Sequence, residues 1–160
     1  MTRLRIGLVS DTHGLLRQEA LDFLAGSDHI VHGGDIGGEE ILVRLAQIAP
    51  LTVVRGNNDT AAWADALPET ATLDLGGIRL LAIHDLKALA FDPLDPRAEG
   101  VRVVVSGHSH RPSCTERDGV LYVNPGSAGK RRFSLPIAVG ELLIDAGRVE
   151  ARLVTLVPPA

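Results

Sequence analysis

A chain of 160 residues fits one domain over residues 1–160 and can bury a hydrophobic core without disulfides or a structural metal. Its 45% hydrophobic and 22% charged residues exclude a disordered chain, and 3% aromatic residues leave the core to Leu, Val, Ala and Ile. The net charge of -4 argues against a protein that mainly neutralises nucleic-acid phosphates.

The single cysteine, Cys114, excludes an intramolecular disulfide and a cysteine-rich zinc site, and it is compatible with a reducing compartment. The apolar run IGLV behind the basic N-terminus is too short for a signal peptide, and no other run approaches the length of a membrane span. We therefore expect a cytoplasmic protein without a membrane partner.

The first third of the chain alternates β-rich runs with segments of helical spacing. We expect strands at 4–10, 29–32 and 51–55, and helices at 15–26 and 39–49. Short connections between such elements predict a parallel sheet with right-handed crossovers. The polar loops at the carboxyl ends of the strands are then the expected position of a functional site.

The rest of the chain, after a predicted short helix at 60–67, is dominated by strands. We expect strands at 71–75, 78–84, 101–107, 113–117, 120–124, 135–145 and 146–157. Gly76-Gly77 and Asp118-Gly119 have the composition of hairpin turns. Two mixed sheets packed face to face, with helices outside, accommodate this order.

Five predicted strand ends carry nearly all the candidate ligands. These side chains are Asp11, His13, Asp35, Asn57, His84, His108 and His110. Each motif alone has an ordinary structural interpretation, such as a helix cap at Asp11 or Thr12 or a tight loop around Asn57. The pair His108 and His110 is stronger, since residues two apart in an extended segment point the same way.

Taken together, these donors favour a metal site over separate structural roles. Carboxylates, imidazoles and an amide oxygen without thiolates suit Mn²⁺, Fe²⁺, Co²⁺, Ni²⁺ or Zn²⁺. Seven candidates are too many for one ion that keeps open positions, so the set predicts two metals that share a ligand.

The motif order D-x-H, G-D, G-N-x-D, H and G-H-x-H, followed by NPGS at 124–127, resembles that of the calcineurin-like metallophosphoesterase superfamily. The chain length is similar to that of the small YfcE-type phosphodiesterases. The resemblance covers essentially the whole chain. It implies an α/β fold, a four-layer α/β/β/α sandwich of two mixed β-sheets, with a dinuclear centre at the strand ends.

Carried over by position, the resemblance implies two divalent transition-metal ions per chain, Mn²⁺ first, with Ni²⁺, Fe²⁺, Co²⁺ and Zn²⁺ as alternatives. It places Asp11, His13 and His110 on one metal. It places Asn57, His84 and His108 on the other, with Asp35 as the bridge. The implied reaction is hydrolysis of a phosphodiester by in-line attack of a metal-bridging hydroxide, with Asp35, Asn57 and His108 contributing directly to catalysis.

Two positions depart from the family pattern. Asn58 stands where many members have a His that resembles a general acid, so we expect a preference for activated or diester substrates over alkyl monoesters. Asp85 follows His84 where the family usually has Gly, which leaves its role open between orienting His84, contacting a metal and shaping substrate access.

Several further residues are candidates for supporting the centre. His32, Asp59 and Asp85 are candidates for holding the second nitrogen of a ligating imidazole, with ordinary loop roles as the alternative. Gly33, Gly34, Gly56 and Gly107 are expected to let the backbone approach the metals closely. The basic run Lys130-Arg131-Arg132 is expected to face solvent, with substrate phosphate as its alternative contact.

The expected partner is a small phosphodiester or nucleotide-like substrate, and the sequence leaves homo-oligomerisation open. The main alternative is a metal-poor scaffold of the same fold, similar to a eukaryotic retromer subunit, but all seven ligand positions are occupied here by ligand-capable side chains. A nucleic-acid-binding module is disfavoured because the chain is acidic and poor in aromatic residues for base stacking.

Overall fold

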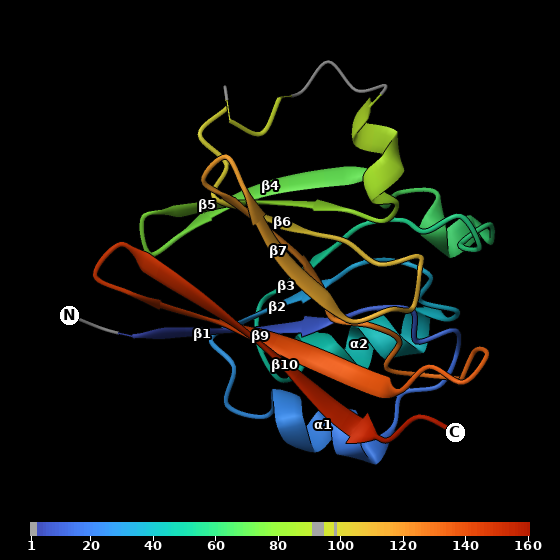
Figure 1. The fold of residues 1–160 in the computed structure, drawn as a ribbon. Helices are drawn as coiled ribbons and strands as arrows, with labels where there is room; N and C mark the ends of the chain where they lie inside the picture. The colour runs from blue at the N-terminus through green and yellow to red at the C-terminus, as the bar shows by residue number, and fades with distance from the viewer. Residues whose placement is uncertain (1–2, 91–94, 98) are drawn as a thin grey trace.

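The computed structural model describes residues 3–90, 95–97 and 99–160, and in it two five-stranded sheets lie face to face (Figure 1). The first sheet has the strand order β10-β9-β1-β2-β3. Its strands are β1 (Leu4–Val9), β2 (His29–His32), β3 (Leu51–Val53), β9 (Ile137–Asp145) and β10 (Arg148–Val157). Strands β1, β2 and β3 run parallel, as predicted, and the β9–β10 hairpin adds two antiparallel strands beside β1.

The second sheet has the order β4-β5-β6-β8-β7. Its strands are β4 (Thr70–Leu75), β5 (Ile78–Ile83), β6 (Val103–Val105), β7 (Ser113–Arg117) and β8 (Val120–Asn124). Strands β5, β6 and β8 run parallel, whereas the predicted β4–β5 and β7–β8 hairpins form antiparallel pairs at the two edges. Both sheets are therefore mixed, as the sequence predicted.

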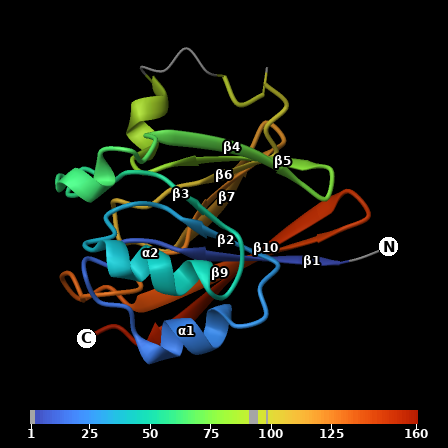
Figure 2. The same ribbon diagram turned by 180° about the vertical axis from the view of Figure 1, so that it is seen from behind.

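The helices lie outside the sheets (Figure 2). Two α-helices, α1 (Gln18–Leu24) and α2 (Glu39–Ala46), cover the outer face of the first sheet. The outer face of the second sheet packs against Leu86 and Leu89 of the 3₁₀ helix η2 (Leu86–Ala90), a helix that the sequence did not predict. The four-layer α/β/β/α sandwich is confirmed, with a thin fourth layer in the described part of the chain. None of the helices in that part is long and apolar enough to cross a membrane.

The predicted helices are shorter than expected. Helix α1 begins at Gln18 because the chain first closes a turn, in which the Leu15 amide donates to the Thr12 carbonyl at 2.9 Å. Helix α2 ends at Ala46 because the amides of the next residues donate to carbonyls three residues back. The segment predicted as a short helix forms only one 3₁₀ turn, η1 (Ala62–Ala64).

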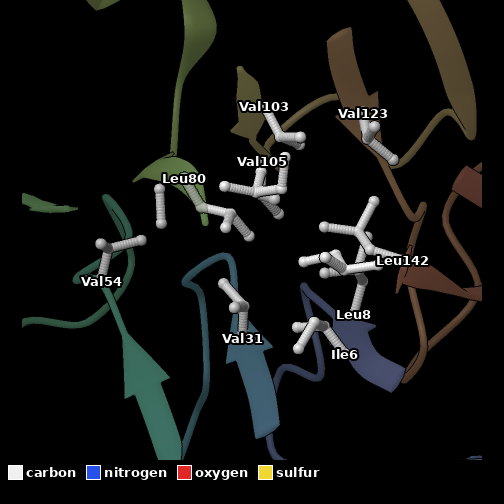
Figure 3. Close-up of a cluster of buried hydrophobic side chains, with 12 residues drawn as sticks. Ile6, Leu8, Val31, Val54, Leu80, Val103, Val105, Val123 and Leu142 are labelled. Carbon is white, nitrogen blue, oxygen red and sulfur yellow. The ribbon is translucent and has the colours of Figure 1, made fainter. Parts of the chain in front are cut away.

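The main core lies between the two sheets (Figure 3). Alternation along β1 sends Ile6 and Leu8 into this core, while Val9 packs toward α1 and α2. At Gly7 an added Cβ would lie 2.5 Å from the Leu24 side chain, so glycine lets α1 pack closely on the sheet. Among the described residues this core contains no aromatic side chain and is built from Ile, Leu, Val and Ala, as the composition predicted.

This arrangement brings strand ends from both sheets to one edge of the sandwich. The backbone amide of Gly107, after β6, donates to the carbonyl of His84, after β5, at 2.9 Å. The carbonyl of Gly33, after β2, lies 2.7 Å from Nδ1 of His84, which ties the first sheet to the second. The polar loops that the sequence singled out therefore lie together.

Candidate metal centre

Asp11, His13 and His110 form the first of two groups of potential ligands, called here group one. Nε2 of His110 lies 3.4 Å from Oδ1 of Asp11 and 3.2 Å from Nε2 of His13. Asp11 and His110 are buried and His13 is half-buried. These side chains come from the loops after β1 and β6, so group one joins the two sheets.

Oδ1 of Asp11 is a buried oxygen to which no described residue donates a hydrogen bond. Its neighbours are instead the ring nitrogens of His13 and His110, which face one another across the same small space. Burying a carboxylate oxygen without a hydrogen-bond donor lowers the stability of the fold by about 1–3 kcal/mol or more. A bound cation beside this oxygen would offset that penalty. A divalent cation fits this donor set of one carboxylate and two imidazoles.

Asp35, His84 and His108 form group two, and the amide oxygen of Asn57 lies among them. Oδ1 of Asn57 is 3.0 Å from Nε2 of His84 and 3.1 Å from Nδ1 of His108. The four side chains follow β2, β3, β5 and β6, so this group also draws on both sheets. Its donors are again oxygen and nitrogen without sulfur, which suits a divalent ion.

Asp35 lies between the two groups. Its Oδ2 is 3.3 Å from Nε2 of His84 in group two and 3.6 Å from Nε2 of His13 in group one. Asn58 holds this carboxylate, since its backbone amide donates to Oδ1 at 2.8 Å and its side-chain amide donates to Oδ2 at 3.2 Å. Burial raises the pKa of Asp35, but the hydrogen bonds from His84 and the Asn58 backbone outweigh burial and lower it to about 2.

Two of the imidazoles have a partner at their other nitrogen. Nδ1 of His84 lies 2.7 Å from the Gly33 carbonyl, and this contact directs Nε2 toward Asn57 and Asp35. Nε2 of His108 lies 3.8 Å from the Asp85 carboxylate, so Asp85 faces His108. Burial lowers the pKa of His84, but hydrogen bonds to Asp35 and Gly33 outweigh it and raise the pKa.

The imidazole of His110 has no such partner among the described residues. No described residue pairs with its Nδ1 atom, which is buried. Burial, together with the neighbouring His13 and Arg132, lowers the pKa of His110 against the opposing effect of Asp11. The imidazole is therefore biased toward its neutral form, which is the form that can bind a cation.

The backbone of the site is strained. Five candidate residues have positive φ angles in the left-handed region, namely Asp11 (52°), His13 (46°), Asp35 (56°), His108 (72°) and His110 (62°). Each such conformation costs on the order of 1–3 kcal/mol for a residue with a side chain, and such strain clusters at functional sites. The fold holds these loops by hydrogen bonds, for example from the Asp11 and His13 amides to the Gly34 and Asp35 carbonyls, both at 3.0 Å.

Asp59 and His32 support these loops and contact no imidazole of the two groups by hydrogen bonds. The buried Asp59 carboxylate accepts hydrogen bonds from the backbone amides of Asp35, Ile36, Gly37 and Gly56 at 2.8–3.3 Å. His32 is fully buried and lies between Thr12 Oγ1 at 3.0 Å and the Gly34 amide at 3.0 Å. Desolvation lowers the pKa of His32 to about 4, so this ring is neutral.

The NPGS segment anchors two of the loops. Nδ2 of Asn124 donates to the Gly107 carbonyl at 2.9 Å and to Ser109 Oγ at 3.1 Å. Oγ of Ser127 donates to the Asp11 carbonyl at 3.0 Å. The sequence indicated this motif but assigned no role to its residues. Ser10, whose Oγ donates to Asp11 Oδ2 at 2.8 Å, was not predicted, because it belongs to no motif.

All four glycines singled out in the sequence, Gly33, Gly34, Gly56 and Gly107, lie where an added Cβ would be within 3.0 Å of another atom, and two of them face candidate carboxylate ligands directly. A Cβ at Gly107 would collide with the Ser10 hydroxyl and lie 2.6 Å from Oδ2 of Asp11. A Cβ at Gly56 would collide with the backbone and carboxylate of Asp35. These glycines therefore let the loops reach the candidate ligand Asp11 and the central Asp35.

Pockets flank the centre on its two sides. One, of about 550 Å³, opens beside group two and includes Asn57, His84 and Asp85 in its wall. The other, of about 410 Å³, opens beside group one and includes His13, His110 and Asn58. A molecule bound across the centre would therefore extend in two directions. The remaining histidine, His29, lies away from the centre and contacts Thr52 at 2.8 Å.

Comparison with known proteins gives concordant results. Residues 4–147 match the family model of the calcineurin-like phosphoesterase superfamily domain. A protein of Methanocaldococcus jannaschii described as a "Probable metallophosphoesterase" is 30% identical to this chain, over 94% of this chain and 81% of its own length.

Two solved structures share the fold. That of an archaeal phosphodiesterase has a TM-score of 0.79 at 21% identity, over 96% of this chain and 100% of its own. That of Vps29 from Entamoeba histolytica, complexed with zinc, has a TM-score of 0.73 at 22% identity, over 95% of this chain and 99% of its own. At these identities the two structures are evidence of the fold alone.

Proposed function

The chain belongs to the calcineurin-like phosphoesterase superfamily, and from this premise we propose that it is a phosphodiesterase with two divalent metal ions. Asp11, His13 and His110 would hold one ion. Asn57, His84 and His108 would hold the other, with Asp35 shared between them. Mn²⁺ is the proposed metal, with Ni²⁺, Fe²⁺, Co²⁺ and Zn²⁺ as alternatives, because the donors are imidazoles, carboxylates and an amide.

The observation that carries this proposal is the position of Asp35. One oxygen of its carboxylate lies within 3.6 Å of an imidazole nitrogen from each group, so a single side chain can serve both. The unpartnered Asp11 Oδ1 supports a cation at group one independently. All seven positions expected from the sequence lie in these two groups or next to them.

Two divalent ions bound there would supply Lewis acidity that lowers the pKa of water and offsets the negative charge of a phosphoryl group. The protein's own part is to hold the donors still. Asn58 fixes both oxygens of Asp35, and the Gly33 carbonyl fixes the ring of His84. Preset donors of this kind reduce the reorganisation needed in the transition state.

The chemistry of the leaving group favours activated esters. Asn58 lines the pocket beside group one and offers an amide, which donates a hydrogen bond but delivers no proton near neutral pH. The pocket wall there holds no carboxyl group among the described residues, and its two histidines are proposed ligands. A substrate that needs little protonation of its leaving group, such as an aryl phosphodiester, is therefore favoured over an alkyl monoester.

The fold neighbour Vps29 raises a second candidate function, a protein-binding scaffold. This chain keeps all seven expected ligand-capable side chains, and five of them stand at strained backbone positions. The 30% identical relative, described as a probable metallophosphoesterase, favours the enzyme. The two functions differ in whether a metal-replete protein turns over a phosphodiester.

The test is a measurement of metal content and hydrolysis on one preparation. Protein purified with added Mn²⁺ should contain close to two metal equivalents per chain by elemental analysis and should hydrolyse bis(p-nitrophenyl) phosphate. Treatment with a chelator should remove the activity, and Mn²⁺ should restore it. Two bound equivalents without hydrolysis would favour the scaffold, and a protein that binds no metal would exclude the proposed enzyme.

A further inference from the structure

The pocket beside group one has a basic wall that the proposed reaction does not use. Its lining consists of His13, Gly37, Asn58, His110 and the consecutive cations Lys130, Arg131 and Arg132. No carboxylate is among these described residues. The pocket beside group two has the opposite character, since its wall includes one cation, Arg55, against three carboxylates, Asp59, Glu69 and Asp85.

The three consecutive cations have different environments. The guanidinium of Arg131 donates to the carbonyls of Leu135 and Pro158, both at 2.8 Å, and so it holds the loop against the C-terminal segment. Lys130 and Arg132 are exposed, and within the described part of the chain no carboxylate lies within 4.0 Å of either one. Their charges are therefore available to a ligand in the pocket.

The backbone that carries Lys130 is fixed to the candidate metal centre. Oγ of the buried Ser127 lies 3.0 Å from the carbonyl oxygen of Asp11 and 3.1 Å from that of Lys130, so its one hydroxyl hydrogen is within reach of both. The amide of Ala128 donates to the Ser10 carbonyl at 3.0 Å, and Nε of Arg17 donates to the Gly129 carbonyl at 2.9 Å. Hydrogen bonds therefore fix the backbone next to Lys130 beside group one.

We propose that Lys130 and Arg132 form a subsite for a second anionic group of the substrate, so that the chain selects phosphodiesters in which one substituent carries a further phosphate. This inference rests on the phosphodiesterase function proposed above and adds a substrate class to it. A guanidinium fork and an ammonium group are the side chains that bind phosphate oxygens best. The acidic wall of the other pocket disfavours the same phosphate there, so binding would have one orientation.

A matched pair of substrates tests this subsite. The p-nitrophenyl ester of thymidine 5′-phosphate is compared with the same ester bearing a 3′-phosphate, and p-nitrophenol release gives kcat/KM for each. Wild-type protein with Mn²⁺ should prefer the 3′-phosphorylated ester by about tenfold, as expected for one charged hydrogen-bonded contact. Equal kcat/KM values for the two esters would overturn the proposal.

The variants separate the subsite from a general effect of charge. The double variant Lys130→Ala and Arg132→Ala should bring the ratio of the two kcat/KM values close to one. The matched control is Arg3→Ala with Arg148→Ala, which removes two positive charges at the opposite end of the first sheet, where Leu4 pairs with Ile144. The control should keep the wild-type ratio. A ratio that persists in the Lys130 and Arg132 double variant would contradict the subsite.

A binding measurement keeps the two proposals distinguishable. Calorimetry compares thymidine 3′,5′-bisphosphate with thymidine 5′-monophosphate on each Mn²⁺-containing protein. The wild type should bind the bisphosphate about tenfold more tightly, and the double variant should lose this difference. If neither ester is hydrolysed but the affinity difference behaves in this way, the phosphodiesterase function is wrong and the anion subsite stands. Equal affinities in the wild type would overturn the subsite whatever the activity.

Discussion

The two ligand groups of the candidate centre differ in their access to solvent. The group-one side chains of Asp11 and His110 are 0% and 2% exposed, and their loops are fastened by Ser10, Ser127 and Asn124. In group two the side chain of His108 is 44% exposed and faces Asp85, which is itself 41% exposed. The most exposed side chain of group one, His13, is only 18% exposed, so group one is the more enclosed of the two, although each group borders a pocket.

This difference indicates that ions in the two groups would have different access to solvent. An ion in group one would lie among the more buried donors. An ion in group two would lie nearer to solvent, beside the exposed His108. Asp35, held on both oxygens by Asn58, joins the enclosed group to the open one. The predictions below test whether the two groups depend on each other.

The largest effect is expected from Asp35→Asn, which removes the shared charge while keeping the shape. Hydrolysis of bis(p-nitrophenyl) phosphate should fall by about a thousandfold or more, because both groups lose a ligand whose charge stabilises bound cations. The measurement is kcat/KM together with metal content. The matched control, Asp145→Asn, removes one carboxylate at the far end of β9 and should keep wild-type activity. Near-normal hydrolysis by Asp35→Asn would refute the shared role.

A smaller effect is expected from protonation of His32, the buried ring that joins the Thr12 loop of group one to the Gly34 loop next to Asp35. Its pKa of about 4 in the folded protein lies below its ordinary value of 6.5. Between these pH values the unfolded chain binds more protons, so the free energy of unfolding falls as the pH falls, by about 3 kcal/mol in total. A protonated ring would also lose the hydrogen bond that Nδ1 accepts from the Gly34 amide.

Urea unfolding of metal-free protein at pH 7, 5.5 and 4 measures this dependence. His32→Gln should be less stable at pH 7 and should lose this part of the pH dependence. Other groups titrate equally in both proteins, so their effects cancel in the difference. The same loss of stability with pH in the variant and the wild type would show that His32 is not responsible.

The smallest effect is expected from Asn58→His, which places a proton donor in the pocket beside group one. The measurement is the turnover of an alkyl monoester and of p-nitrophenyl phosphate. Turnover of the alkyl monoester should rise by about tenfold. This is less than a full general-acid effect, because the variant loses the side-chain amide contact with Asp35. Metal content serves as the control. Unchanged monoester rates with full metal content would count against the role assigned to position 58.

Much of the fold could be predicted because its signals are local. Alternation marked the strands, Gly76-Gly77 and Asp118-Gly119 marked two hairpins, and the parallel order of β1, β2 and β3 followed from the alternation of strands and helices. Since carboxyl ends of parallel strands share one edge, the polar loops could be expected to meet. The helix η2 was missed because it packs through Leu86 and Leu89 on a sheet formed by distant segments.

The details of the centre depend on contacts that local sequence does not encode. The sequence left Asp59 open between holding an imidazole and an ordinary loop role, and its carboxylate lies where four backbone amides from two loops converge. Which nitrogen of His108 faces Asn57 depends on the approach of β3 and β6 from different sheets. The left-handed φ of His110 reflects tertiary constraints, since only a small fraction of residues other than glycine adopt that region.

Anomalous diffraction from Mn²⁺-containing crystals of the wild type, His110→Ala and His108→Ala tests the central claim most directly. The wild type should show two manganese peaks, one on each side of Asp35. His110→Ala should lose the peak beside Asp11 and His13, and His108→Ala should lose the peak beside Asn57 and His84. A single peak in the wild type, or loss of the same peak in both variants, would contradict a centre of two groups joined through Asp35.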